Sequence, residues 1–298
     1  MKDLLQALST ITVLKDEPLN KYTFTKTGGP ADFLIFPKNK QEVQAVVQYA
    51  NAHEIPWLVL GNASNLIVRD GGIRGIVMML TELDALEAHG TMLYAGAGAK
   101  LIDLSYFALQ QRLTGLEFSC GIPGSVGGAL FMNAGAYDGE IANVVAHVEV
   151  LKPDGTFATY ENSELAFSYR HSLVQETGDI ILGGYFQLAC GDVDAIKFRM
   201  EELTKVRQEK QPLEYPSCGS VFKRPEGHYT GKLIQDAGLQ GLKWGGAQIS
   251  EKHAGFIVNI DHATATDYLE LIAHIQQVIW DKFLVRLETE VRILGEEV

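Results

Sequence analysis

Apolar and polar residues follow a strand–helix–strand pattern in the first part of the chain. Asp32–Phe36 is a short apolar run that stops at a proline, which predicts a strand. Asn39 resembles the cap of a helix whose apolar residues recur at helical spacing to about His53. Trp57–Leu60 and Leu66–Val68 then read as buried strands. This order predicts a small α/β unit near the N-terminus.

The middle of the chain is richer in strands. A helical stripe of apolar residues runs from Leu101 to Leu113, and Lys152–Gly155 is a strong hairpin turn. The predicted strands are Gly75–Leu80, Thr91–Ala95, Val144–Leu151, Thr156–Tyr160 and Asp179–Ala189.

A polar helix over residues 192–210 reads as a connector into a C-terminal domain. That domain has a predicted helix near 230–238, a strand at Gly255–Ile260 and a long helix over 265–284 that Thr264 would cap. Arg286–Leu294 alternates apolar and polar residues, which predicts a closing strand. On this strand Glu290 would point away from the apolar Leu287, Val291 and Ile293. The fold class that these patterns predict is α+β.

Composition and charge narrow the class of protein. A chain of 298 residues is long enough for about two domains, and 46% hydrophobic with 21% charged residues is typical of a globular protein. The net charge of −12 argues against an extended nucleic-acid or anionic-membrane partner, since both need a basic surface. There is no leader-like segment and no apolar run of membrane-spanning length, so we expect the cytoplasm.

The three cysteines are far apart in sequence and form no CxxC motif. They therefore indicate neither a disulfide framework nor a structural zinc site, and we expect reduced, mostly buried thiols and no bound metal. The motifs GxGxxG, GxxxxGK[ST], HExxH and GxSxG are all absent. A Rossmann dinucleotide site, a P-loop, a zincin site and a nucleophile elbow are excluded as sequence-level hypotheses.

Two glycine-rich loops remain as candidates for binding. They are Gly61–Asn65, between two predicted strands, and Gly121–Gly128, which leads into residues 129–137. Such loops expose consecutive backbone N–H groups and let a diphosphate approach closely. Either loop alone could be no more than a tight turn. Together, in an acidic chain, they favour a bound dinucleotide or a similar anionic ligand.

Three further positions could carry chemistry. Ser220 lies in a glycine-flanked turn within Ser217–Lys223, Arg170 lies among aromatic residues, and Glu290 lies on the closing strand. An arginine in such a setting can clamp a carboxylate with two parallel hydrogen bonds. Each position also has an ordinary structural explanation, namely a turn serine, a surface ion pair and a solvated strand face.

In this order, these segments resemble the UDP-N-acetylenolpyruvoylglucosamine reductases, also called UDP-N-acetylmuramate dehydrogenases, flavoenzymes of cell-wall precursor synthesis. The resemblance runs from about Lys21 to Gly295. No single matching segment is specific for the family, but all seven in the same order are. Those pieces are TGGPADFLIFP (27–37), VLGNASNLIVRDGGIRGIV (59–77), GIPGSVGGALFMNAGAY (121–137), SYRHS (168–172), YPSCGSVFKRP (215–225), GLKWGGAQISEKHAGFIVN (241–259) and LETEVRILG (287–295).

The resemblance implies a fold and a reaction. It implies a flavin-binding module of the vanillyl-alcohol-oxidase type with two α/β subdomains, at 1–75 and 76–200, and a substrate-binding domain at 201–298. It implies that NADPH reduces non-covalently bound FAD, and that reduced FAD reduces UDP-N-acetylglucosamine enolpyruvate to UDP-N-acetylmuramate. The chain looks like the shorter subtype without an inserted tyrosine-bearing loop, since Arg170–Asp192 holds little besides one strand.

The resemblance also implies roles for individual residues. Ser220 falls on the family's proton-donor serine, Arg170 on its catalytic arginine and Glu290 on its catalytic glutamate. The implied FAD-binding residues are Gly61, Asn62, Ala63, Ser64, Asn65, Leu66, Gly121, Ile122, Gly124, Ser125, Gly128, Ala129, Asn133, Gly135 and Ala136. The proposed substrate-binding residues are Lys210, Tyr215, Lys223 and His253, the first and third from a cationic set that also contains Lys205, Arg207 and Arg224.

Two alternatives stay open at this point. One is a flavin-dependent oxidase of the same superfamily, which would share the two glycine-rich loops but has no reason to carry the GSVF and EVR elements. The other is a non-catalytic nucleotide-binding module, against which the intact set of Ser220, Arg170 and Glu290 argues. No histidine or cysteine lies within 57–70, so we expect no covalent flavin link.

Overall fold

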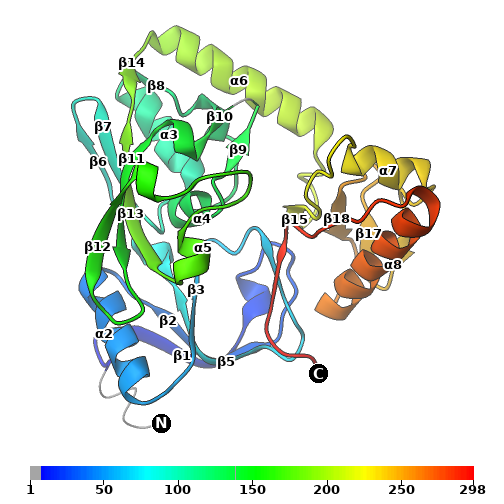
Figure 1. Cartoon of the computed structure of the whole chain (residues 1–298), viewed down its shortest axis with the longest axis horizontal. Coiled ribbons are helices and arrows are strands. Elements are labelled where there is room, and N and C mark those ends of the chain that lie inside the picture. Colours follow the sequence, from blue (N-terminus) through cyan, green and yellow to red (C-terminus); the bar gives the residue numbers. More distant parts are fainter. Residues whose placement is uncertain (1–7, 138) are drawn as a thin grey trace. The chain divides into compact units, whose positions relative to one another are not determined.

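The computed structural model describes residues 8–137 and 139–298, and the chain divides into two compact units (Figure 1). Unit 1 contains the described residues up to Lys15 together with Phe33–Asn62 and Gly75–Arg207. Unit 2 contains Asp16–Asp32, Ala63–Arg74 and Gln208–Val298. Each unit is therefore assembled from segments that are far apart in the chain.

An antiparallel five-stranded sheet of order β12-β11-β13-β7-β6 forms much of unit 1. Its central strands are buried on both faces, and helix α4 (Val126–Phe131) packs against β13 (Figure 1). Apolar β-branched and aromatic side chains suit this two-sided burial. The strands are β6 (Leu86–His89), β7 (Met92–Gly96), β11 (Val145–Leu151), β12 (Phe157–Glu161) and β13 (Ile180–Gln187).

A second sheet has the order β1-β2-β5-β3, and most of its residues belong to unit 1. Its strands are β1 (Thr12–Pro18), β2 (Pro30–Phe36), β3 (Trp57–Leu60) and β5 (Ile73–Met79). Helix α2 (Lys40–Ala52) begins at Asn39, whose Oδ1 accepts a hydrogen bond from the Glu42 N–H at 2.9 Å. The predicted cap is confirmed, and the predicted apolar stripe of this helix is buried.

The remaining elements connect these layers. The longer helices are α3 (Leu101–Gln110) and α6 (Val193–Lys210), and a boundary between the units falls within α6. The short elements are α5 (Val174–Thr177), β8 (Leu113–Thr114), β9 (Gly135–Ala136), β10 (Gly139–Glu140), β14 (Ala189–Cys190) and the 3-10 turns η1 (Leu19–Lys21), η2 (Leu80–Glu82), η3 (Glu117–Ser119), η4 (Ile141–Asn143) and η5 (Asn162–Glu164).

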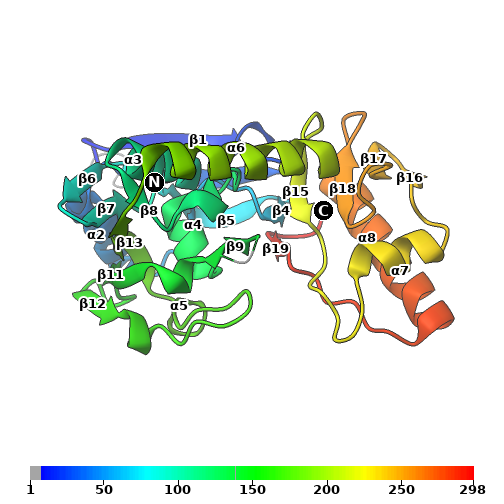
Figure 2. The same cartoon turned by 90° about the horizontal axis from the view of Figure 1, so that it is seen from above.

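Unit 2 is built on a four-stranded antiparallel sheet of order β15-β18-β17-β16 with helices α7 and α8 (Figure 2). Helix α8 (Ala265–Phe283) starts with the predicted capping box of Thr264 and Asp267. Its buried stripe includes Tyr268 and Leu271 and packs into the core of the unit. The other elements are α7 (Thr230–Asp236), β15 (Ser217–Ser220), β16 (Lys243–Trp244), β17 (Ala247–Ile249) and β18 (Phe256–Asn259).

The closing strand is shorter than its alternating pattern predicts. Only β19 (Arg292–Leu294) forms a strand, and it pairs in parallel with β4 (Leu66–Val68). The prediction of one strand over Arg286–Leu294 is wrong for residues 286–291, although Leu287 and Val291 are buried as expected. The backbone there bonds to residues 221–223, around one isolated bridge between Phe222 and Thr289, and to the Gln276 side chain, without forming a continuous ladder.

The α+β fold class is confirmed by these elements. Most predicted elements agree with the observed ones to within a few residues. Among the helices of residues 8–137 and 139–298, none is both long and apolar enough to cross a membrane.

Candidate functional site

The two glycine-rich loops meet within unit 1. A Cβ placed on Gly61 would lie only 2.1 Å from Oγ of Ser125, in the second loop. The Asn62 side chain also crosses to that loop and donates from Nδ2 to the Pro123 carbonyl oxygen at 2.7 Å. The structure therefore brings together two segments that are about 60 residues apart in the chain. A side chain at position 61 would displace the Ser125 hydroxyl, which glycine leaves in place.

The first loop presents free backbone donors. The N–H groups of Asn62, Ala63, Ser64 and Asn65 donate no hydrogen bond to any described residue. Ala63 is buried and has a left-handed backbone, with φ of +48°. Consecutive unpaired N–H groups around such a residue form the kind of concavity that binds an anion. This donor set fits the diphosphate of FAD.

A cationic side chain lies against the second loop. A Cβ on Gly121 would meet Cδ of Arg207 at 2.7 Å, so this side chain covers the glycine. Burial lowers the pKa of the Arg207 guanidinium, with Tyr137 and Cys120 nearby. No carboxylate within the described part of the chain pairs with Arg207. A largely desolvated guanidinium without an acidic partner is suited to a bound anion.

Helix α4 begins within the second loop, so Val126–Gly128 are its first three residues. Ser125 caps it, since its Oγ accepts from the Gly128 N–H at 3.2 Å. A Cβ on Gly127 would lie 2.9 Å from the Cβ of Ala97, so the helix packs tightly against the residue that follows β7. Asn133, two residues after the end of the helix, is buried and left-handed, with φ of +41°. The loop and the helix are thus tightly fixed around the predicted FAD-binding residues.

Arg170 lies at the tip of a tight turn in unit 1. Ser168 and His171 exchange two backbone hydrogen bonds, at 3.2 and 3.1 Å, and form the base of the turn. Arg170 itself has a φ of +58°, and its guanidinium carbon lies 5.3 Å from the centre of the Tyr169 ring. Asn133 donates from Nδ2 to the Ser168 carbonyl oxygen at 3.1 Å. The turn is therefore attached to the segment that follows α4.

Ser220 and Glu290 come together in unit 2. Ser220 ends β15, and the carbonyl oxygen of the next residue, Val221, accepts from the N–H of Glu290 at 2.8 Å. One residue further, Phe222 forms a bridge with Thr289. Both Ser220 and Glu290 are half-buried. Two residues predicted to be catalytic are thus neighbours in space although 70 positions separate them in the chain.

The first glycine-rich loop reaches the same pair. Asn65 donates from Nδ2 to the Glu290 carbonyl oxygen at 3.3 Å, and its own carbonyl oxygen accepts from the N–H of Arg292 at 3.2 Å. Burial lowers the pKa of the Arg292 guanidinium. Within unit 2 the structure therefore joins one end of the proposed diphosphate loop to the proposed catalytic glutamate. Arg292 was not among the predicted site residues.

Cys218, the cysteine closest to Ser220 in the sequence, has an unreactive thiol. Cys218 lies two residues before Ser220 and is fully buried, and burial raises the pKa of its thiol to about 12. The charge of Glu290 contributes in the same direction. A thiol protonated at neutral pH is a poor nucleophile. The chemistry of this site therefore falls to oxygen and nitrogen groups rather than to sulfur.

The four proposed substrate-binding residues are all in unit 2, in different settings. Lys223 lies close to the Ser220–Glu290 pair, since its N–H donates to the Glu288 carbonyl at 2.9 Å and its Nζ lies 3.3 Å from a Glu288 carboxylate oxygen. Lys210 and Tyr215 are exposed. Burial lowers the pKa of His253, whose Nδ1 accepts from the Gly255 N–H at 3.1 Å. This bond leaves Nε2 as the N–H of the neutral ring.

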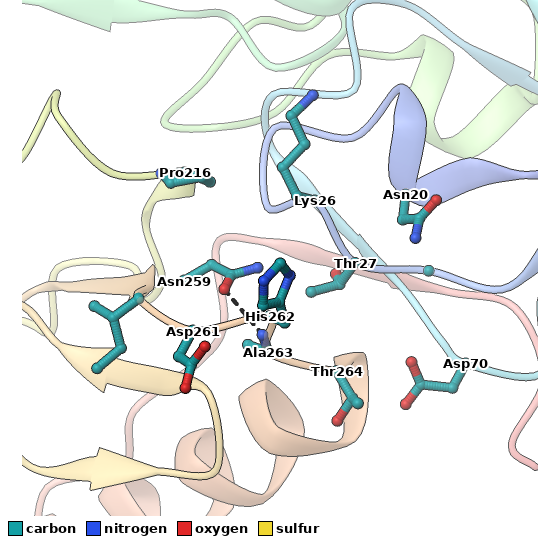
Figure 3. Close-up of a pocket in the computed structure, with 12 residues that line it drawn as sticks. Asn20, Lys26, Thr27, Asp70, Pro216, Asn259, Asp261, His262, Ala263 and Thr264 are labelled. Carbon is teal, nitrogen blue, oxygen red and sulfur yellow. Dashed lines mark hydrogen bonds between the residues drawn. The ribbon is translucent and has the colours of Figure 1, made fainter.

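A cavity of about 500 Å³ in unit 2 involves none of the predicted site residues (Figure 3). At its edge Asn259 accepts at Oδ1 from the Ala263 N–H and donates from Nδ2 to the Thr25 carbonyl oxygen, both at 2.9 Å. Asp70, also at the edge, accepts from the N–H groups of Ala265 and Thr266, both at 2.9 Å. The polar groups of Asn259 and Asp70 thus bond to other parts of the protein. Their role at the cavity edge is to hold the fold together.

Comparison with known proteins adds independent observations. The profile of the UDP-N-acetylenolpyruvoylglucosamine reductase C-terminal domain matches residues 211–294. The profile of an FAD binding domain matches residues 31–160. The first contains Ser220 and Glu290, and the second contains both glycine-rich loops.

Whole-chain relatives agree with these profiles. UDP-N-acetylenolpyruvoylglucosamine reductase of Enterococcus faecalis is 65% identical over 100% of this chain and 99% of its own length. The protein of the same name from Levilactobacillus brevis is 62% identical over 100% of this chain and 98% of its own length. The crystal structure of UDP-N-acetylenolpyruvylglucosamine reductase from Thermus caldophilus is similar with a TM-score of 0.81 and 36% identity, over 95% of this chain and 98% of that one. A glucose dehydrogenase, Phl p 4.0202, shares the fold alone, at 15% identity with a TM-score of 0.51 over 64% of this chain and 44% of its own.

Proposed function

Because the chain belongs to the UDP-N-acetylenolpyruvoylglucosamine reductase family, we propose that Ser220, Arg170 and Glu290 carry the reaction of that family here. The chain is an FAD-dependent oxidoreductase of peptidoglycan precursor synthesis, and NADPH is its reductant. It reduces the enolpyruvyl ether of UDP-N-acetylglucosamine to UDP-N-acetylmuramate. Its substrate is thus a small molecule.

FAD, when bound, supplies the hydride that it has received from NADPH. The N–H groups of residues 62–65 would hold its diphosphate, and the residues around Gly61 and Ser125 would lie against it. Arg207 beside Gly121 adds positive charge at the second loop. The observation that supports this assignment is the run of four backbone donors without a protein acceptor. The flavin would be bound without a covalent link, since no histidine or cysteine lies within 57–70. Cys120, next to the second loop, is buried, and its Sγ lies 3.5 Å from the Met200 carbonyl oxygen.

Arg170 and Glu290 would stabilise the charge that develops on the substrate. Addition of hydride to the β-carbon of the enolpyruvyl group pushes electrons onto its carboxylate and gives an enolate-like species. Arg170 would neutralise this charge with its guanidinium. Glu290 would act as a protonated hydrogen-bond donor to the same group, which is how a carboxylic acid assists an enolate.

Ser220 would donate the proton to the α-carbon. An alcohol is a weak acid in water, so this role needs a strongly basic intermediate and a fixed position. The structure supports the second condition, since Ser220 ends a strand of the sheet and the residue after it is bonded to Glu290. This adjacency of Ser220 and Glu290 is the single observation that carries the proposed function of the site.

The substrate's diphosphate would be held by cationic and polar groups of unit 2. We assign the diphosphate to Lys210 and Lys223, of which Lys223 lies beside the Ser220–Glu290 pair, and other parts of the substrate to Tyr215 and His253. The division of the chain into flavin subdomains at 1–75 and 76–200 and a substrate domain at 201–298 is part of the same proposal. So are a cytoplasmic location and the absence of nucleic-acid and membrane partners. The family membership favours this reductase over an oxidase or a non-catalytic module.

The proposal is tested by Ser220→Ala in anaerobic stopped-flow measurements of the two half-reactions. Reduction of the flavin by NADPH should stay within about twofold of the unmodified protein. Reoxidation by the enolpyruvyl substrate should fall by ~10²–10⁴-fold, the usual contribution of a general acid. Ser217→Ala, on the same strand, is the matched control and should affect neither half-reaction. Equal damage to both half-reactions by Ser220→Ala would remove the proton-donor assignment.

A further inference from the structure

Gln175 connects the Arg170 turn to the helix that follows the second glycine-rich loop. Its Nε2 donates to the carbonyl oxygen of Phe131 at 2.7 Å and to the carbonyl oxygen of Arg170 at 3.1 Å. The same nitrogen lies 3.9 Å from Sδ of Met132. Phe131 is the last residue of α4. One amide nitrogen with two hydrogens thus bonds both segments at once.

This contact acts on a residue whose backbone is under strain. A left-handed φ of +58° is unfavourable for an arginine, and it persists only where the surroundings impose it. The base of the turn is held by the Ser168–His171 pair and by Asn133. The tip is reached by Gln175 through the Arg170 carbonyl oxygen. That bond constrains the peptide that directs the Arg170 side chain.

The effect of removing Gln175 should be concentrated at Arg170. The Phe131 carbonyl oxygen also accepts from Oγ of Ser172 at 2.6 Å, so α4 keeps a polar contact with this segment without Gln175. Gln175 itself is half-buried in a helix of one turn, α5, and its neighbour Val174 supplies the apolar anchor of that helix. The amide is therefore not needed for burial of the helix.

We propose that Gln175 is a positioning residue for Arg170, which it holds at a fixed place relative to the flavin-side helix α4. The inference rests on the proposed role of Arg170 in stabilising charge on the substrate carboxylate. A displacement of the guanidinium by about 1 Å would weaken this stabilisation, and misplacements of that size can cost up to ~10²-fold in rate. Flavin binding and flavin reduction do not use Arg170 and should be unaffected.

The test uses Gln175→Glu, which keeps the shape of the side chain but cannot donate a hydrogen bond to either carbonyl. We expect kcat for the overall reaction and the rate of flavin reoxidation by the enolpyruvyl substrate to fall by roughly 10-fold or more. NADPH reduction and FAD content should stay unchanged. Gln175→Lys restores N–H donors and should recover most of the lost rate. Gln187→Glu, on β13, is the matched control: it likewise removes an amide that donates to protein oxygens, at Thr91 and Leu188, and should leave both half-reactions unchanged.

A double-mutant cycle with Arg170→Ala separates positioning from general destabilisation. If Gln175 acts through Arg170, then Gln175→Glu should have no further effect on reoxidation once Arg170 is alanine. Additive losses, or equal losses for Gln175→Glu and Gln175→Lys, would overturn the inference. If Gln175→Glu fails to fold, Gln175→Met takes its place, since it removes the donors without adding a charge.

The same cycle distinguishes failure of the inference from failure of the proposed function. Slow reoxidation in Arg170→Ala with a normal rate in Gln175→Glu would refute only the positioning role. Normal reoxidation in Arg170→Ala would refute the role of the arginine itself, and with it the basis of the inference.

Discussion

The backbone N–H of Glu290 lies 2.8 Å from the carbonyl oxygen of Val221, the residue that follows Ser220. The contact is between main-chain atoms, so it survives a change of either proposed catalytic side chain. Substitutions at Ser220 and Glu290 should therefore report on chemistry more than on folding. This makes the pair well suited to side-chain replacement.

Replacement of Glu290 should slow reoxidation of the flavin by substrate. In the proposed mechanism the carboxylic acid donates a hydrogen bond to the developing enolate, and loss of one such donor typically costs ~10²–10³-fold. Glu290→Ala should show this loss, and Glu290→Gln, which keeps an N–H donor, should retain more activity. The measurement is single-turnover reoxidation. Glu226→Gln, an exposed carboxylate of unit 2, is the control, and an equal loss there would contradict the assignment.

Gly61→Ala should weaken FAD binding. The added Cβ would lie 2.1 Å from Ser125 Oγ, so this hydroxyl must turn away from the Gly128 N–H that it accepts from, or the loops must move apart. Overpacking of this kind costs about 1–3 kcal/mol, and 1.4 kcal/mol corresponds to a tenfold change in Kd. Titration of apoprotein with FAD measures the change. Gly231→Ala, where the added carbon meets nothing closer than 3.6 Å, should leave FAD affinity unaltered.

Asp70→Ala should destabilise unit 2 without touching the proposed chemistry. The Asp70 carboxylate accepts from two N–H groups at the start of α8 and from Oγ1 of Thr266 at 2.7 Å. Loss of such a cap costs ~0.5–2 kcal/mol of unfolding free energy. Chemical denaturation is the measurement. Asp261→Ala removes an exposed carboxylate nearby, and a loss as large as that of Asp70→Ala would show that charge alone matters.

Thiol labelling should distinguish the three cysteines. Cys190 is exposed, whereas Cys120 and Cys218 are buried. At pH 8 a thiol reagent should therefore modify one group rapidly in the folded protein and all three after unfolding. Cys190→Ser should abolish the fast phase. Fast labelling that persists in this variant would mean that a buried thiol is reachable in the native state.

Alkaline pH should destabilise the fold in part through Cys218. Burial raises the pKa of its thiol from about 9 to about 12, so the folded state binds the proton more tightly than the unfolded chain. This contribution is fully present below pH 9 and is lost as the pH rises toward 12. The unfolding free energy should therefore fall less steeply over this window in Cys218→Ala than in the unmodified protein. Cys190→Ala should keep the original slope.

Local signals made much of the fold predictable. Asn39 and Thr264 each cap a helix through groups three residues away, and apolar spacing located the buried faces of α2 and α8. The predicted closing strand is too long, because the length of a strand depends on how far its partner strand pairs with it. Alternation alone could not show that pairing with β4 begins only at Arg292.

The parts of the site that escaped prediction depend on contacts between distant segments. Asp70 caps a helix that begins 195 residues later in the chain. Gln175 carries no sequence signal of its own, and its contacts with Phe131 and Arg170 are seen only in the structure. Nothing in the spacing of the EVR element indicated that Asn65 would bond to Glu290. The roles of Ser220, Arg170 and Glu290 entered through the resemblance and stay predictions until they are tested.

The parallel pairing of Leu66–Val68 with Arg292–Leu294 has a consequence for the order of events during synthesis. The partner of β4 is synthesised more than 200 residues after β4 itself, so the segment that follows the first glycine-rich loop cannot pair with β19 until all of the intervening chain has been made. Contacts of such long sequence separation slow folding and prolong the exposure of unpaired edges. A nascent chain stalled shortly before residue 290 should therefore hold most of unit 1 in folded form while it still lacks the ability to retain flavin.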